Sequence, residues 1–169
     1  MFDKKTACIC AVTPWLLLLC GTLHAAMPDA KLATEILNEA GVKGGLIVHV
    51  GCGDGTVTAA LHRNDGCLVH GLTVDDGKME RARAFLRQKG VYGPVAVDSF
   101  DGARLPYADG AVNLVVSEDL KQVPMAEVQR VLSPHGVAYL KQDGDWRKIV
   151  MPWPETIDDW SHYLHGHSR

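Results

Sequence analysis

The chain has 169 residues, which fits one domain, and 47% of its residues are hydrophobic, as in a folded globular protein. Its net charge of −3 excludes the strongly basic composition that is typical of nucleic-acid-binding proteins. We therefore expect a globular domain that has no nucleic-acid partner. Seventeen glycines favour a loop-rich α/β protein.

The first segment of the chain is typical of a secretory signal peptide. Two lysines precede an apolar run over residues 7–20, and two alanines end the segment at residue 26. A basic start, an apolar middle and small residues at the end are the marks of a cleavable export signal. We predict a signal peptide over residues 1–26 and an exported protein, periplasmic or secreted. The alternative is an uncleaved membrane anchor, because residues 7–26 are nearly long enough to cross a bilayer.

The first strand of the predicted domain ends in a series of glycines. Residues 46–50 are mostly aliphatic and predict a buried strand. Gly51, Gly53 and Gly55 follow it, and residues 56–63 can form a helix. Glycine allows positive φ and a close approach of the backbone to a ligand, and a helix start offers free N–H groups. The stretch therefore predicts a cradle for a nucleotide-like ligand.

Strand-like and helix-like segments alternate along the rest of the chain. The expected helices cover residues 28–40, 78–89 and 125–132, and the further strands cover residues 67–72, 95–97, 111–116 and 137–140. This alternation implies parallel βαβ units. We predict an α/β fold with a Rossmann-like, doubly wound, mostly parallel sheet and a core of about five strands over residues 27–145. A tail rich in Trp, Pro and His follows over residues 146–169.

Four loops are expected to meet at one edge of this sheet. In a doubly wound sheet, ligands bind at the carboxyl ends of the strands, where the strand order reverses. The loops at that edge cover residues 51–55, 73–76, 99–101 and 117–119. The ligand site is therefore predicted there.

Several segments, taken together, resemble a class I S-adenosylmethionine-dependent methyltransferase of the type 11 kind. The matching segments are residues 48–55, 69–72, 100–109, 111–115 and 127–136. The Leu-Pro-Tyr loop and the Arg-Val-Leu-Ser-Pro turn, in this order, make the resemblance specific. The glycine spacing GxGxG also differs from the GxGxxG of nicotinamide-dependent enzymes. The resemblance implies a methyltransferase that uses S-adenosylmethionine on an unidentified small-molecule acceptor.

The resemblance also implies roles for individual residues. The implied cofactor-binding residues are His49, Gly51, Cys52, Gly53, Gly55, Thr73, Asp75, Asp101 and Ser117. The glycine backbone would face the methionine part of the cofactor, and Asp101 would accept a hydrogen bond from the adenine amino group. Glu118 and Asp119 follow the fourth strand, where the family places groups near the transferred methyl. Either could act as a catalytic base; the alternative is that both are solvated loop carboxylates.

Two positions depart from the family pattern. The family usually has an acidic residue where this chain has His49, and another where it has Thr73. Threonine can make one hydrogen bond to a ribose but not a charge-assisted bidentate pair. Asp75 or Asp76, two or three residues further on, could substitute for the missing acid. These departures support a second hypothesis, an exported, catalytically weakened methyltransferase-like module that binds a ligand or serves a structural role.

The tail suggests a missing partner domain. Residues 153–166 are similar to the junction in large exported proteins in which a methyltransferase-like domain precedes a quinoprotein-type β-propeller. This similarity implies a β-propeller partner domain that is absent from this chain, and a chain that is a shortened form of a longer protein.

The tail also contains three closely spaced histidines. His162, His165 and His167 form an H-x-x-H-x-H pattern near the terminus. No acidic ligand is fixed nearby, and terminal histidines are usually solvated. We therefore expect no metal site.

Overall fold

A computed structural model describes residues 27–120 and 123–154 of the chain. The predicted signal peptide, the histidines of the tail and most of the predicted junction to a β-propeller lie outside these residues and stay predictions. No helix within the described ranges is long and apolar enough to cross a membrane. In the same ranges, no three His, Cys, Asp or Glu side chains are placed to hold a metal ion.

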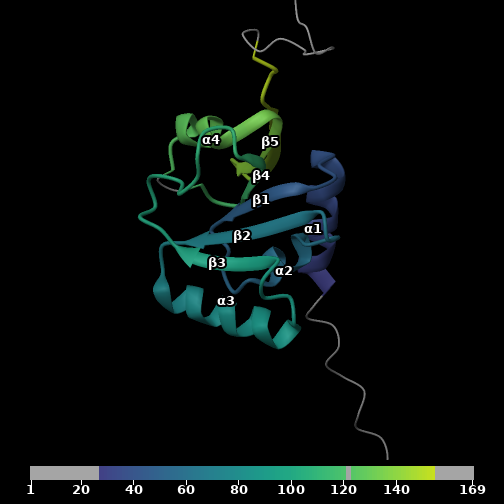
Figure 1. Cartoon of the computed structure of the whole chain (residues 1–169), viewed down its shortest axis with the longest axis vertical. Helices are drawn as coiled ribbons and strands as arrows, with labels where there is room; N and C mark the ends of the chain where they lie inside the picture. Colours follow the sequence, from purple (N-terminus) through teal and green to yellow (C-terminus); the bar gives the residue numbers. More distant parts are fainter. Residues whose placement is uncertain (1–26, 121–122, 155–169) are drawn as a thin grey trace, which may run out of the picture.

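The described residues form four helices and a six-stranded sheet (Figure 1). The elements in chain order are α1 (Met27–Ala40), β1 (Gly45–Val50), α2 (Thr56–Leu61), β2 (Cys67–Thr73), α3 (Asp76–Lys89), β3 (Val95–Ser99), β4 (Val112–Ser117), α4 (Met125–Val131), β5 (Leu132–Gln142) and β6 (Asp145–Val150). The strand order is β3-β2-β1-β4-β5-β6, and only β6 is antiparallel to its neighbour. The predicted fold class, a mostly parallel Rossmann-like sheet, is confirmed. The order reverses between β1 and β4, which places a ligand site at their carboxyl ends.

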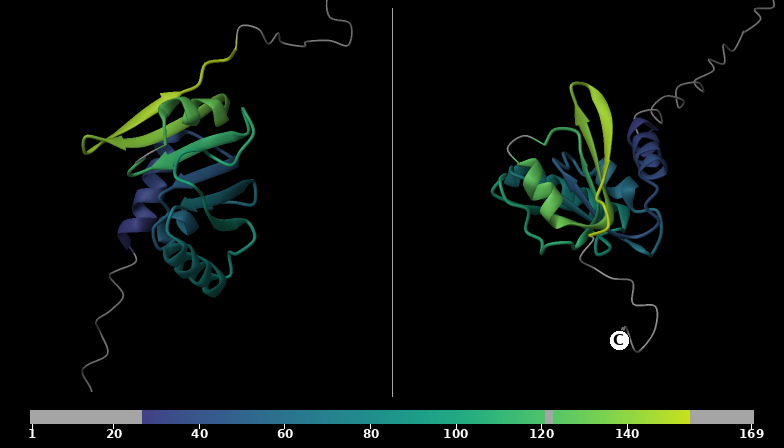
Figure 2. Two further views of the ribbon diagram at one scale, coloured as in Figure 1. Left: turned by 90° about the vertical axis from the view of Figure 1, so that its left-hand side faces the viewer. Right: turned by 90° about the horizontal axis from the view of Figure 1, so that it is seen from above.

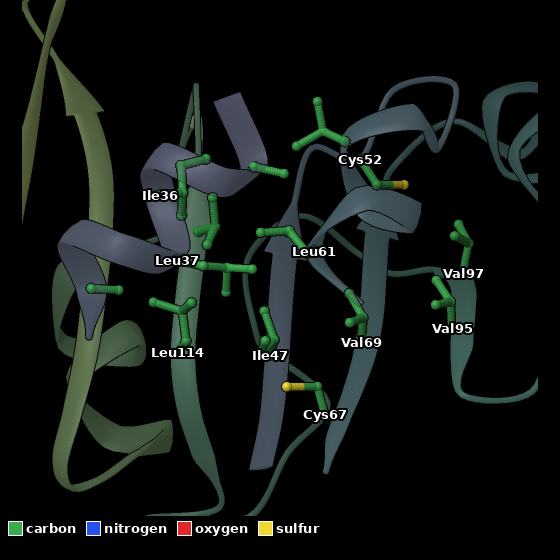
Figure 3. Close-up of a cluster of buried hydrophobic side chains, with 14 of the residues drawn as sticks. Ile36, Leu37, Ile47, Cys52, Leu61, Cys67, Val69, Val95, Val97 and Leu114 are labelled. Carbon is green, nitrogen blue, oxygen red and sulfur yellow. The ribbon is translucent and has the colours of Figure 1, made fainter. Parts of the chain in front are cut away.

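Helices cover both faces of the sheet. Side chains of α1, α2 and α3 share one buried cluster, and those of α4 belong to another. Viewed from above, α1 and α4 lie on opposite sides of the sheet (Figure 2, right). Figure 3 shows Ile36 and Leu37 of α1 above Leu114 of β4, with Leu61 beside Ile47. Each fully buried aliphatic side chain of this kind contributes about 1.5–3 kcal/mol to folding.

The Leu-Pro-Tyr loop is held against α4 by a single arginine. Arg130 donates hydrogen bonds to the backbone carbonyls of Tyr107 (2.9 Å) and Leu105 (3.1 Å). The amide of Leu105 in turn donates to Oε1 of Glu127 at 2.9 Å. These bonds explain why the two family segments occur together, since one binds the other. They also hold in place the loop that follows β3 and contains Asp101.

The sheet extends beyond the boundary that we placed at residue 145. β6 pairs with β5 from residue 145 to 150, so the sheet has six strands rather than about five, and β5 is covered on both edges. Asp143 and Gly144 join the two strands with φ angles of 54° and 93°, the signature of a type I′ hairpin turn. Trp146, which we assigned to the tail, stacks on Tyr139 with ring centroids 5.0 Å apart. The hairpin could have been predicted from the sequence, because an Asp-Gly pair between two strand-like runs is typical of such a turn.

The β5–β6 turn yields a test of the sixth strand. Replacing Gly144 by Ala forces an L-residue into a left-handed conformation, which costs about 1–2 kcal/mol. Asp143→Asn is the matched control, because Asn tolerates this conformation. Urea unfolding should show a loss for Gly144→Ala and almost none for Asp143→Asn. Equal stability of both variants and the parent chain would contradict the turn.

Candidate functional site

The glycine turn after β1 is tied to the end of β2. The amides of Gly51 and Cys52 both donate to the carbonyl of Leu72, at 2.8 and 3.2 Å. Gly51 and Gly53 have φ angles of 85° and 57°, which glycine adopts without strain. A Cβ atom at Gly53 would meet no atom within 4 Å. The turn therefore leaves its backbone open at the carboxyl edge of the sheet.

A cavity of about 220 Å³ lies beside this turn. Its apolar wall is formed by Val50, Val74, Phe100, Leu120 and Val123. Asp75, Asp101 and Asp119 also line it. An apolar slot with a few polar groups at its edge suits a flat ring that carries hydrogen-bond donors.

Asp101 is ordered by its own loop. Its Oδ1 atom accepts hydrogen bonds from the amides of Arg104 and Ala103, both at 2.9 Å. These bonds hold the pKa of Asp101 below its usual range, so the side chain is a carboxylate at neutral pH. Among the described residues, nothing hydrogen-bonds to Oδ2. The carboxylate therefore keeps one oxygen for a ligand in the cavity.

Thr73 and Asp75 meet at the β2 side of the same cavity. Thr73 is buried, and its hydroxyl accepts a hydrogen bond from the amide of Asp75 at 3.2 Å. Asp75 caps α3, because its Oδ1 accepts from the amide of Lys78 at 3.0 Å. This bond lowers the pKa of Asp75. The carboxylate of Asp75 thus lies close to position 73, where the family pattern has an acidic residue and this chain has the neutral Thr73.

A second cavity of about 610 Å³ adjoins the first. The two share the linings Gly51, Gly53, Lys78 and Asp119. The second cavity is also lined by the predicted residues His49, Cys52 and Glu118, and by Asp29, Asp54 and Arg81. The structure therefore gathers most of the predicted residues around two adjoining cavities that share the glycine turn.

His49 and Cys52 bring no charge to this space. His49 is only 3% exposed, and burial lowers its pKa to about 4, so its ring is neutral at neutral pH. Its Nδ1 atom lies 2.8 Å from Oγ1 of Thr58. Burial raises the pKa of the Cys52 thiol to about 11. A Cβ atom added at Gly71 would lie 2.8 Å from the Cβ of Cys52, so position 71 of β2 requires glycine for the glycine turn to pack against it.

Gly55 and Ser117 are not among the described residues that line either cavity. A Cβ atom at Gly55 would lie 3.1 Å from the Cβ of Ala82, so the glycine allows α3 to pack close to the turn. Ser117 is fully buried, and its hydroxyl donates to the carbonyl of Val50 at 3.0 Å. The structure thus gives both residues a packing role, and the cofactor contact that the resemblance implied for them stays a prediction.

Several residues that line the cavities were not predicted from the sequence, among them Phe100 and Lys78. Phe100 forms part of the apolar wall, and its amide donates to the carbonyl of Thr73 at 3.0 Å. Lys78 lines both cavities from the first turn of α3. The sequence could have indicated Phe100, because it directly precedes Asp101 at the predicted ligand edge. It gave no indication of Lys78, because a lysine in a helix is usually solvated.

Comparison with known proteins gives a consistent family. A family model described as "Methyltransferase domain" matches residues 47–136, more than half of the chain. An uncharacterized protein of Haemophilus influenzae is 27% identical over 120 residues, which cover 65% of this chain and 48% of that protein. Methyltransferase GfsG of Streptomyces halstedii is 35% identical over 96 residues, which cover 53% of this chain and 34% of GfsG. The chain thus spans about half or less of the length of these relatives.

Solved structures share the fold at low sequence identity. A Methanococcus maripaludis protein assigned as an S-adenosylmethionine-dependent methyltransferase has a TM-score of 0.62 at 21% identity, over 69% of this chain and 57% of that chain. The [4+2]-cyclase SpnF has a TM-score of 0.60 at 24% identity, over 66% and 43%. A geranyl diphosphate methyltransferase in complex with S-adenosylmethionine has a TM-score of 0.59 at 24% identity, over 66% and 48%.

The buried His49 ring makes stability depend on pH. The unfolded chain protonates this ring near pH 6.5, and the folded chain does so near pH 4. Between these values the unfolded state binds more protons, so about 3 kcal/mol of stability is lost as the pH falls from 6.5 to 4. His49→Gln removes this titration and leaves all carboxylates in place. In urea unfolding, the stability difference between parent and variant should shift in favour of the variant as the pH falls. A constant difference would show that His49 is not buried and neutral.

Proposed function

Because the chain belongs to the methyltransferase domain family, we propose that it binds S-adenosylmethionine in the two joined cavities and methylates a small molecule. Family membership confirms the resemblance drawn from the sequence motifs. The proposal is supported chiefly by the two adjoining cavities at Gly51 and Gly53, of which the first is lined by Asp101 and the second by Glu118. The acceptor of this chain is not identified; one structural neighbour is named for a geranyl diphosphate acceptor.

The first cavity has the chemistry to hold an adenosine. Phe100 and Val123 offer apolar surface to a base, and the ligand-facing oxygen of Asp101 can accept from an adenine amino group. Thr73 and Asp75 can accept from ribose hydroxyls. The residues present therefore fit the adenosine part of the cofactor, with the ribose contact shifted from the strand end to Asp75.

The second cavity has the chemistry to complete the site. S-adenosylmethionine, when bound, supplies an electrophilic methyl group on a positively charged sulfur. Glu118 and Asp119 lie at the end of β4 beside the glycine turn, where carboxylates favour a cation. Either can take a proton from an acceptor group, as a general base does. The chain otherwise needs only to align acceptor and methyl group, which is the main requirement of an in-line displacement.

Asp101 provides the sharpest test of cofactor binding. In Asp101→Asn the side-chain oxygen can still accept from Ala103 and Arg104, but an amide nitrogen replaces the ligand-facing oxygen. Loss of a hydrogen bond to a charged acceptor weakens binding by roughly 1.5–3 kcal/mol, about one to two decades. Calorimetric titration with S-adenosylmethionine should show this loss, with an unchanged melting temperature. No heat from the parent chain at millimolar cofactor would refute the proposal.

A weakened binding or structural module is the second candidate function. It is favoured by the two neutral side chains, His49 and Thr73, at positions where the family pattern is acidic. Each missing charged acceptor removes roughly 1.5–3 kcal/mol of possible ligand affinity. In this reading the chain binds the cofactor weakly and turns over slowly or not at all.

Restoring an acid at position 73 separates these two candidates. In Thr73→Asp a carboxylate oxygen can replace the hydroxyl that accepts from the amide of Asp75, and the second oxygen can reach a ribose. If the site is weakened, titration should show S-adenosylmethionine bound about tenfold more tightly. Thr73→Ser, which keeps a hydroxyl, is the control and should leave the affinity unchanged. An unaltered affinity in Thr73→Asp would indicate that Asp75 already fulfils the role.

A further inference from the structure

His49, which lines the second cavity, forms a buried pair with Thr58 that the proposed function does not use. Oγ1 of Thr58 lies 2.8 Å from Nδ1 of His49, and both side chains are buried. The methyl group of Thr58 packs against Gly71, 3.1 Å from where a Cβ would be, with the hydroxyl directed to the ring. Within the described part of the chain, this ring nitrogen is the sole hydrogen-bond partner of that hydroxyl.

The pair sets the position of the proton on the His49 ring. A buried hydroxyl needs an acceptor for its proton, and Nδ1 is the acceptor at hand. On this ground we assign Thr58 as the donor and Nδ1 as the acceptor of the 2.8 Å contact. Burial keeps the ring neutral, with a pKa of about 4. A neutral imidazole that accepts at Nδ1 carries its own proton on Nε2, so Nε2 of His49 is a hydrogen-bond donor.

That donor opens onto the cavity. His49 lines the second cavity, and its Nε2 has no hydrogen-bond partner among the described residues. Among the described residues, only one side-chain nitrogen or oxygen is both buried from solvent and without a hydrogen-bond partner, and it is Nε2 of His62, not of His49. Nε2 of His49 is therefore accessible, and the space it can reach is the cavity.

The charges around this donor are mixed. Asp54 and Glu118 bring carboxylates to the cavity, and Lys78 and Arg81 bring cations. A lining with both signs suits a zwitterion better than an uncharged or a purely anionic group. Lys78 and the glycine turn also line the first cavity, so one ligand can extend across both.

We propose that Nε2 of His49 donates a hydrogen bond to the carboxylate of an α-amino-acid group that extends from an adenosine held in the first cavity. This inference rests on the proposed function and adds a residue to it. The acidic residue that the family pattern has at this position can only accept hydrogen bonds when it is ionised. The hydrogen-bond polarity of the position is therefore reversed in this chain, and Thr58 is the residue that fixes it.

Nitrogen NMR of the histidine-labelled chain tests the proton position without any ligand. At neutral pH the His49 ring should show a protonated Nε2 and an unprotonated Nδ1. Thr58→Val, which removes the donor, should abolish this preference, and Thr58→Ser should keep it. Thr34→Val is the matched control, because the Thr34 hydroxyl donates to the carbonyl of Ala30 on the exposed side of α1. A proton on Nδ1 in the parent chain would overturn the inference and leave the proposed function standing.

Calorimetry with two ligands tests the contact itself. S-adenosylhomocysteine carries the amino-acid group, and 5′-methylthioadenosine lacks it. His49→Ala should weaken S-adenosylhomocysteine binding about tenfold to a hundredfold and change 5′-methylthioadenosine binding by less than about twofold. His49→Gln, whose amide nitrogen can stand in for Nε2, should recover most of the affinity.

The outcomes of this titration are distinct. An equal loss for both ligands in His49→Ala would mean that the residue supports the fold and not the carboxylate, and would overturn the inference. Failure of the parent chain to bind S-adenosylhomocysteine, while His49 shows the expected proton position, would instead refute the proposed function beneath it.

Discussion

The carbonyl of Leu72 is the point on which the site depends. It accepts hydrogen bonds from the amides of both Gly51 and Cys52, and it lies opposite Val50 in the parallel register of β1 and β2. The chain must therefore turn away at the residue where β1 ends. This places His49 before the turn, Gly53 on its open side and Thr73 directly beyond the accepting carbonyl. A bulky residue at Gly51 or Gly53 would strain this turn, because both positions have positive φ.

Around this turn, charge is distributed differently from the family pattern. Burial makes His49 neutral, and Thr73 carries no charge, so the acids that line the first cavity are Asp75, Asp101 and Asp119 from the adjoining loops. The fold alone does not fix the reaction, since a protein named as a [4+2]-cyclase shares it. Our proposal of methyl transfer rests on the family membership together with the first cavity, which Asp101 lines, and the second cavity with its mixed charge.

The parts of this arrangement that could be predicted from the sequence are those in which the local sequence pattern agrees with the tertiary structure. The aliphatic run of β1, the three glycines and the alternation of strands and helices were sufficient for the fold and for the edge at which the site lies. β6 was missed because its Trp and neighbouring Pro residues were interpreted as a tail, although the Asp143-Gly144 pair indicated a hairpin. The packing of Gly55 against Ala82 and the hydrogen bond from Ser117 to Val50 could not be predicted, because no local sequence pattern reveals these distant partners. The proton position on His49 likewise depends on Thr58, nine residues away on another element.

A crystal structure of the chain with S-adenosylhomocysteine would test the proposed site most directly. We expect the adenine against Phe100 with its amino group on Asp101, the ribose near Asp75, and the amino-acid carboxylate within hydrogen-bond distance of Nε2 of His49. A ligand bound elsewhere on the sheet, or one whose amino-acid end points away from His49 and the glycine turn, would contradict it.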